Sequence, residues 1–185
     1  MSYNSLNIKQ KLNLVLAIVM LGLLSVSSFG LLHEKKSLLE DRKVKTRNLV
    51  ESAHSVLLHY HALQVAGDLS ETEAKAGALG VLKSMRYEGT EYFWVNDMTP
   101  RVIMHPIKSE LDGKDASEIQ DPNGKRIFVS FVETVKTSGS GFVDYKWPKP
   151  GADAPVEKIS YVQGFEPWGW VVGSGIYIDD INEIF

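Results

Sequence analysis

The sequence predicts an α+β fold, in which one five-stranded antiparallel sheet is covered by a long N-terminal helix and preceded by one transmembrane helix. Three observations predict it. Residues 12–32 carry no charge, residues 34–66 place apolar side chains at helical spacing, and β-branched and aromatic segments follow residue 90. Because short loops separate neighbouring strand candidates, these are expected to pair as antiparallel hairpins. A sheet with helices on it is a layered α+β architecture.

The first element is an uncharged segment of 21 residues, from Leu12 to Leu32. As a helix it would be about 31 Å long, which matches the hydrocarbon core of a bilayer. A buried helix of a soluble protein would have a polar face, and this segment has none. A cleaved signal peptide is the alternative, although its apolar region is normally shorter. We interpret the segment as an uncleaved membrane anchor.

The charges on the two sides of this segment bear on its orientation. Lys9 and Lys11 precede it, and six lysines and arginines follow between residues 35 and 47. The positive-inside rule would therefore place the C-terminal side in the cytoplasm. Large domains are translocated regardless of their charge, so this pattern alone does not fix the orientation.

Two helices are expected after the anchor. Residues 34–66 contain neither glycine nor proline, and Gly67 ends the helical pattern. Ser70 followed by Glu73 forms the pattern of a capping box, which predicts that a second helix begins there and continues to about Met85.

The remaining elements are strands around one further helix. The strand candidates are residues 92–96, 101–105, 141–147, 157–163 and 168–177. Asp121-Pro122 has the order of a helix cap followed by a first-turn proline, which predicts a helix from there to Thr137. The long helix is expected to cover one face of the sheet. The other face is left to the short helix, to loops and to a ligand.

Composition excludes several classes of function. The 185 residues suffice for one domain, and a net charge of -3 without a basic stripe argues against nucleic acid as a partner. With no cysteine, the chain has no disulfide and no thiol chemistry. It contains no GxSxG, phosphate-binding glycine loop or HExxH motif, so we expect neither an enzyme nor a cofactor. His54 and His61 would lie about 10 Å apart on a helix, too far for one metal ion.

The strands place aromatic and ionisable side chains on shared faces. Alternate residues of a strand share a face, so Tyr92 lies beside Trp94, and Tyr145 beside Trp147. Plain core packing is one interpretation. Together with Arg86, His105 and Lys158, the set favours a small polar pocket, because cations seldom enter a core without an anion to pair with.

Seven segments in one order carry a family resemblance. They are RYEGTEYFWVND (86–97), MHP (104–106), LDGKD (111–115), DPNGK (121–125), GFVDYKWPKPG (141–151), KISYV (158–162) and PWGWVVGSGIYIDDI (167–181). The stretch from Met85 to Tyr177 resembles the single Cache sensor domains of bacterial methyl-accepting chemotaxis proteins and of related membrane sensors.

The resemblance implies a PAS-like Cache domain that faces the periplasm, in a protein of the inner membrane. The expected boundaries are residues 1–11 for a cytoplasmic N-terminus, 12–32 for the transmembrane helix and 34–185 for the ligand-binding domain. A second membrane helix and a cytoplasmic signalling part are expected beyond Phe185. The function implied is binding of a small carboxylate, of the acetate, propionate, pyruvate or lactate class, and signalling across the membrane.

The resemblance also implies the binding residues, which are Arg86, Tyr92, Trp94, His105, Tyr145 and Lys158. Arginine and lysine would bind the carboxylate by charge-assisted hydrogen bonds, tyrosine and histidine would add neutral donors, and Trp94 would limit the length of the ligand. Tyr161 has the opposite strand parity to Lys158, so we leave it out of the site.

Two further expectations concern partners and alternatives. The long helix has more apolar surface than one sheet covers, so we expect a homodimer in which Leu38, Leu39 and Val44 pack against the same helix of a second subunit. The alternative functions are an anchored or secreted solute-binding module, and the sensor domain of a histidine kinase or cyclase.

Overall fold

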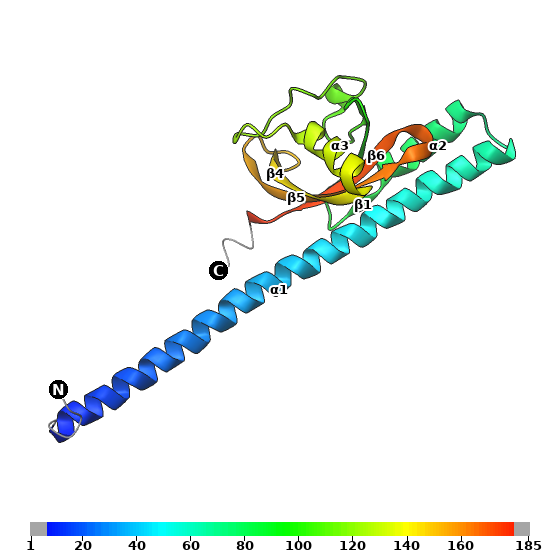
Figure 1. Cartoon of the computed structure of the whole chain (residues 1–185). Coiled ribbons are helices and arrows are strands. Elements are labelled where there is room, and N and C mark those ends of the chain that lie inside the picture. The colour runs from blue at the N-terminus through cyan, green and yellow to red at the C-terminus, as the bar shows by residue number, and fades with distance from the viewer. Residues whose placement is uncertain (1–6, 180–185) are drawn as a thin grey trace. The chain divides into compact units, whose positions relative to one another are not determined.

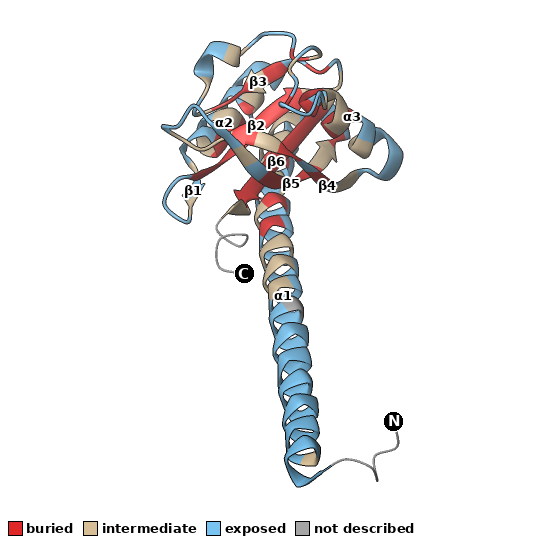
Figure 2. Cartoon of the chain, turned by 90° about the vertical axis from the view of Figure 1, so that its left-hand side faces the viewer, coloured by how far each residue is buried: buried red, intermediate tan, exposed pale blue. Residues whose placement is uncertain are grey.

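The computed structural model describes residues 7–179, and helix α1 occupies the first third of them. α1 runs from Ile8 to Ala66. The chain divides into two compact units, with the boundary between Glu40 and Asp41. Within the part up to Glu40, α1 holds an 18-residue window of mean hydropathy 2.4 with no buried residue, the one helix in the described chain that is long and apolar enough to span a membrane. Figure 2 shows this part as mostly exposed.

The larger unit holds one antiparallel sheet and the helices that cover it (Figure 1). The helices after α1 are α2 (Glu71–Ser84) and α3 (Ile127–Ser138), with 3-10 turns at Ser109–Leu111 and Glu166–Trp168. The strands are β1 (Arg86–Tyr87), β2 (Glu91–Asp97), β3 (Val102–Met104), β4 (Ser140–Pro148), β5 (Pro155–Phe165) and β6 (Trp170–Tyr177). Their order is β1-β2-β6-β5-β4, with β3 paired to β2. The predicted α+β fold is confirmed, and the two-residue strand β1 adds to the five strands expected.

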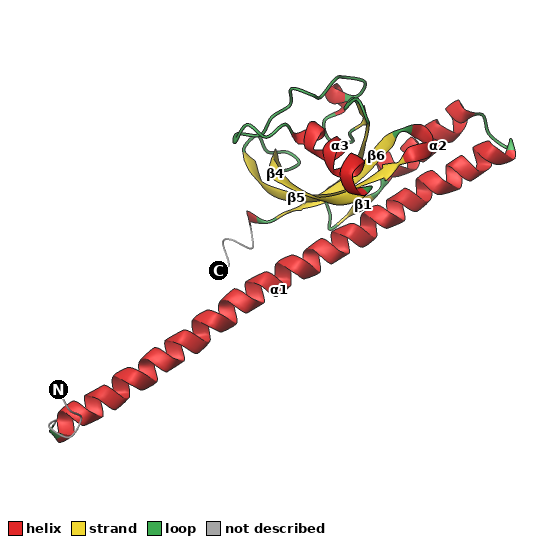
Figure 3. Ribbon diagram, viewed as in Figure 1, coloured by secondary structure: helices red, strands yellow, loops and turns green. Residues whose placement is uncertain are grey.

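One face of the sheet packs against α1 and α2 (Figure 3). Val50, Ala53 and Leu57 of α1 are fully buried there, against side chains that include Phe93 and Phe165. These helical residues are three or four positions apart, which is the spacing of a single helix face. The expectation that the long helix covers one face of the sheet is thereby confirmed.

The opposite face packs against α3 and the loop that precedes it (Figure 3). Phe128 and Phe131 of α3 contact each other edge to face, with ring centroids 5.4 Å apart, and both are buried. Full burial of one such phenylalanine stabilises the fold by about 1.5–3 kcal/mol. This face also collects Tyr92, Trp94 and Tyr145.

The predicted capping box at the start of α2 is present. Ser70 is the N-cap, the Glu73 amide donates to its Oγ at 3.3 Å, and the Ser70 amide donates back to Glu73 Oε2 at 2.9 Å. The Glu73 carboxylate also accepts from the Ser70 hydroxyl at 2.6 Å, and the bonds from this hydroxyl and from the Ser70 amide lower the pKa of Glu73. Two amides that the first turn leaves without helical partners are satisfied in this way.

The predicted helix up to Thr137 is present as α3, but its predicted start at Asp121-Pro122 is wrong, because α3 begins only at Ile127. Asp121 does not cap a helix. Its Oδ1 accepts from the amides of Asn123 and Lys125, and its Oδ2 accepts from the Lys146 amide of β4. An aspartate that binds amides two and four residues ahead closes a turn. Gly124, with φ +82°, completes this turn in a conformation that favours glycine.

Ser70→Ala should lower the free energy of unfolding by about 1 kcal/mol, because the Glu73 amide at the start of α2 loses its side-chain acceptor. Thermal unfolding of the chain in detergent, followed by tryptophan fluorescence, measures the change. Ser55→Ala is the matched control, since Ser55 is exposed and its hydroxyl donates only to Glu51 O within α1. Equal melting temperatures for the two variants would contradict a stabilising role of the cap.

Candidate ligand-binding site

Four of the predicted site residues line one small cavity on the α3 face of the sheet. Tyr92, Trp94, His105 and Tyr145 meet there. The rest of the lining is aromatic or aliphatic and consists of Ile127, Phe128, Phe131 and Trp147. The cavity has a volume of about 10 Å³. That is room for about one water molecule.

Lys158 lies beside this cavity and is the most deeply buried cation of the site. It is 1% exposed, and its Nζ lies 4.5 Å and 4.4 Å from the ring centroids of Tyr92 and Tyr177. The ammonium donates to both tyrosine hydroxyls at 3.3 Å. Within residues 7–179 no carboxylate forms an ion pair with it. Burial lowers the pKa of Lys158 to about 8, so the side chain is mainly charged at neutral pH.

His105 lies against Tyr92 and Trp147, with ring centroids 5.0 Å and 6.1 Å away. It follows the end of β3, and its amide donates to Asp112 Oδ1 at 2.7 Å. The amides of Ile107 and Lys108 donate to its Nδ1, so that nitrogen is an acceptor and the proton is on Nε2. Burial, with the nearby charges of Lys158 and Lys108, lowers the pKa of His105 to about 3. The imidazole is therefore a neutral hydrogen-bond donor.

The tyrosines of the cavity are also neutral donors. Burial raises the pKa of Tyr92 to about 12, and it raises the pKa of Tyr145 well above its usual value. The Tyr145 hydroxyl forms a 2.9 Å hydrogen bond with Ser160 Oγ. Buried phenols stay protonated because the ionised form loses its hydration. A cation and several neutral donors around one point are complementary to a small anion.

Trp94 forms an apolar wall of the cavity. Its ring lies 5.1 Å from that of Phe131, and its Nε1 donates to Asn96 Oδ1 at 3.2 Å. Gly173 of β6 allows this position, because a Cβ there would lie 2.5 Å from the indole. A larger residue at position 173 would collide with the indole, and Trp94 would have to shift.

Arg86 is the predicted residue that the structure does not bring to this cluster. Its side chain is exposed, and its guanidinium donates to Lys83 O at 2.8 Å and Met85 O at 2.7 Å. Carbonyls at the end of a helix attract cations, and the end of α2 holds this one in place. Tyr161 packs on the face of the sheet that α1 and α2 cover, and its hydroxyl donates to Ser140. This agrees with the prediction that Tyr161 and Lys158 point to opposite faces of their strand.

Sequence reasoning missed Tyr177 and Glu91. Tyr177 stands opposite Lys158 in the register of β5 and β6, which no local pattern reveals. Glu91 is 9% exposed, and burial is the main cause that raises its pKa. The sequence signal for its burial was its position directly before the aromatic residues YFW, at the start of a buried strand.

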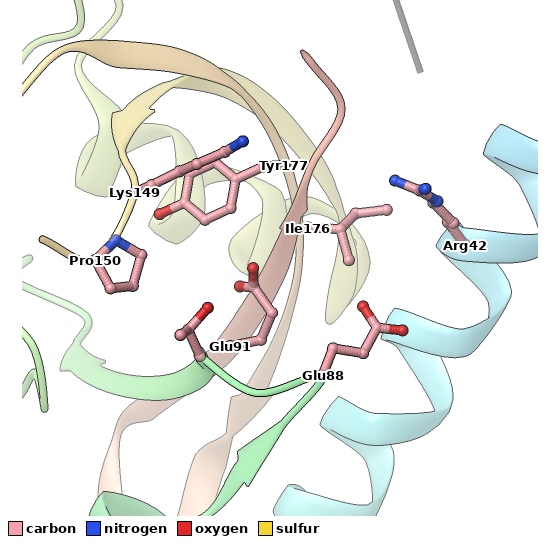
Figure 4. Close-up of a pocket in the computed structure, with 8 residues that line it drawn as sticks. Arg42, Glu88, Glu91, Lys149, Pro150, Ile176 and Tyr177 are labelled. Atoms are coloured by element: carbon pink, nitrogen blue, oxygen red, sulfur yellow. The ribbon is translucent and has the colours of Figure 1, made fainter. Parts of the chain in front are cut away.

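A larger hollow of about 470 Å³ lies on the outer side of Tyr177 (Figure 4). Its lining consists of Arg42, Glu88, Thr90, Glu91, Lys149, Pro150, Ile176 and Tyr177. Two of the charged groups are engaged, since Lys149 pairs with Asp179 at 2.6 Å and Glu88 pairs with Lys45. Tyr177 thus borders both this hollow and the ammonium of Lys158.

Known proteins resemble the chain over most of its length. A chemotaxis protein of Pseudomonas putida, "Methyl-accepting chemotaxis protein McpP", is 41% identical over 98% of this chain. "Sensor histidine kinase MctS" of Rhizobium johnstonii is 31% identical over 80% of it. The chain spans about a third of these curated relatives, 33% and 31% of their lengths.

Solved structures agree with this result. One, titled "Periplasmic sensor domain of chemotaxis protein", is 55% identical with a TM-score of 0.75, and the match covers 76% of this chain and 98% of that one. Another, titled "Structural basis for carboxylic acid recognition by a Cache chemosensory domain", is 45% identical with a TM-score of 0.75, and the match covers 78% and 98%. A family model described as a Cache domain matches residues 8–185, and the chain therefore belongs to the Cache domain family.

Proposed function

We propose that this chain is the ligand-sensing part of a chemoreceptor and that it binds a small monocarboxylate beside Lys158. The observation that carries the proposal is the buried ammonium of Lys158, which has tyrosine hydroxyls and ring faces around it and no carboxylate paired to it in the described chain. A ligand carboxylate would supply the missing anion. His105 and the tyrosines would add neutral hydrogen bonds to its oxygens.

The lining supports a short ligand. Trp94, Phe131 and Trp147 surround the cavity with large apolar rings, so a two- or three-carbon chain fits better than a long one. Since the cavity holds only about 10 Å³, a ligand has to displace side chains of its lining. Binding would thus change the packing between α3 and the sheet.

The relatives support both the ligand class and the sensor role. The 45%-identical Cache domain is titled for carboxylic acid recognition, and the first curated relative is a methyl-accepting chemotaxis protein. We propose the same role here, with residues 1–11 in the cytoplasm, 12–32 in the inner membrane and 34–185 in the periplasm. A homodimer through Leu38, Leu39 and Val44 and cytoplasmic signalling partners stay predictions. The kinase relative makes a histidine kinase sensor the second candidate.

Acetate, propionate, pyruvate or lactate should raise the melting temperature of the chain in detergent. The stabilisation follows RT ln(1 + [L]/Kd), because only the folded state binds. Amino acids should stabilise less, since the cavity lining offers no carboxylate to receive an ammonium group. A thermal-shift screen in which only amino acids, sugars or amines act would contradict the proposal.

Lys158→Met should weaken propionate binding by roughly tenfold to hundredfold, because it removes a charge-assisted hydrogen bond worth about 1.5–3 kcal/mol. Folding should survive, since methionine avoids the cost of burying a charge. Arg86→Met is the matched control, because the guanidinium is engaged at the end of α2. A larger loss of propionate affinity in Arg86→Met than in Lys158→Met, measured by calorimetry, would mean that the binding site does not lie beside Lys158.

The stability of the ligand-free protein should decrease as the pH falls below about 6.5. The unfolded His105 binds a proton there, whereas the folded one stays neutral down to about 3. The slope is at most about 1.4 kcal/mol per pH unit for this group. Urea unfolding at several pH values should show a shallower dependence for His105→Gln. His54→Gln, at a half-buried histidine, should change the slope less. The reverse ranking would contradict the buried neutral state of His105.

A further inference from the structure

Glu91 is a buried carboxylate that the proposed ligand site does not explain. It begins β2 and is 9% exposed, whereas Glu88 and Thr90 before it are exposed. Its Oε2 is buried and accepts no hydrogen bond from the described residues. Figure 4 shows its carboxylate directed toward Tyr177. A buried carboxylate without hydrogen bonds is costly, so a nearby positive charge is needed to keep it ionised.

The charged groups around Glu91 come from several elements. Lys158 of β5 is the largest electrostatic influence on it after burial, and Glu88 and the β4–β5 loop residue Lys149 follow. Arg42 of α1 lines the same hollow. Glu88 and Lys149 are paired with Lys45 and Asp179. The neighbouring tyrosines 92, 145 and 177 stay protonated because burial raises the pKa of each.

The dependence between Glu91 and Lys158 is mutual. Among the described residues, Glu91 carries the one charge that favours the ammonium of Lys158. Both groups lie near Tyr177, because Lys158 donates to its hydroxyl and Glu91 lines the same hollow, and they form no direct ion pair within the described chain. Each charge thus stabilises the other without direct contact, and the burial of both groups strengthens this interaction.

We propose that Glu91 is the internal counter-ion of Lys158 and that carboxylate binding beside Lys158 is accompanied by proton uptake at Glu91. This inference rests on the proposed function. Glu91 then sets both the affinity for carboxylates and the pH dependence of that affinity. The step is an acid–base reaction, in which the Glu91 carboxylate takes one proton from the buffer acid in the solvent, leaving the buffer's conjugate base, and becomes a neutral carboxyl group.

The physical reason is that two anions would share one buried cation. A bound carboxylate cancels the positive potential of Lys158 at Glu91 and adds a like charge, and both effects favour the protonated form. The pKa of Glu91, already raised by burial, therefore rises further in the complex. Because the complex then holds more protons than the free protein, affinity increases as the pH falls, at most about tenfold per pH unit.

Calorimetry of the chain in detergent with propionate tests the inference. Measurements at about pH 6.5, in two buffers with different ionisation enthalpies, give the protons taken up per ligand. At this pH Lys158, with a pKa of about 8, is already protonated and His105 is neutral, so neither contributes much. We expect uptake of a substantial fraction of one proton by the unmodified chain.

Glu91→Gln should abolish most of this uptake and tighten propionate binding by roughly threefold or more at about pH 6.5, well below the pKa of Lys158, since no competing anion remains. Glu88→Gln is the matched control, because Glu88 borders the same hollow but is exposed and paired with Lys45. It should keep the uptake. Undiminished uptake in Glu91→Gln, or binding of propionate by the unmodified chain without any uptake, overturns this inference and leaves the proposed function standing. Absence of propionate binding to the unmodified chain overturns both.

Infrared difference spectroscopy detects protonation of a carboxylate directly. It uses the unmodified chain, so it does not require any variant to fold. Addition of propionate labelled with ¹³C at its carboxyl should produce a protonated-carboxyl band from the protein, separate from the bands of the ligand. The band should grow as the pH is lowered from about 7.5 to 6.5, in step with the calorimetric proton count. A spectrum without this band at ligand saturation rejects Glu91 as the proton acceptor.

Discussion

The burial of one ammonium group between two tyrosine rings determines the chemistry of this domain. Strand β5 lies between β4 and β6, so Lys158 stands opposite both Tyr145 and Tyr177. A cation in that position has lost its water and needs ring faces and hydroxyls in exchange. The same charge helps to keep His105 neutral and is the main positive influence on Glu91. Much of the polar character of this face follows from it.

The two faces of the sheet bury different kinds of side chain, and this difference allows one face to hold the buried Lys158 ammonium. On the face covered by α1 and α2, Phe93, Phe165 and Val172 pack against these helices in a core that contains no buried cation among the described residues. The α3 face also carries a large aromatic cluster. The sheet is therefore stabilised by apolar packing on both of its faces. It can hold the Lys158 ammonium on the α3 face, although burial of that charge is itself unfavourable.

The helices and strands could be predicted from the sequence because their signals are local. The capping box at Ser70 and the strand alternation after residue 90 each depend on neighbours within a few positions. The start of α3 could not be predicted, since Asp121 is as suitable for a cap as for a turn, and the choice depends on the Lys146 amide of a distant strand.

The same limit applies to the candidate site. Alternate residues of a strand point to the same face, and this rule correctly placed Tyr92 and Trp94 on one face and Tyr161 on the opposite face from Lys158. Tyr177 depends on the register between β5 and β6, which is a property of the strand pair, whereas the position of Glu91 before a buried strand was a local signal. Arg86 was expected in the site, and the structure holds it elsewhere for another reason. A flexible cation next to a helix end binds the free carbonyls there, and its residue type does not reveal this choice.

The segment between β3 and α3 has a consequence for the rates of binding and release. It is fastened near both ends by aspartates, as Asp112 accepts from the His105 amide and Asp121 accepts from the Lys146 amide. Gly113 and Ala116 add backbone bonds to Val102 and Pro100. A segment held at so many points cannot swing open as a lid without breaking several hydrogen bonds. Passage of a small molecule would then depend on rotation of aromatic side chains such as Trp147, so exchange would be governed by ring motions within a fixed backbone.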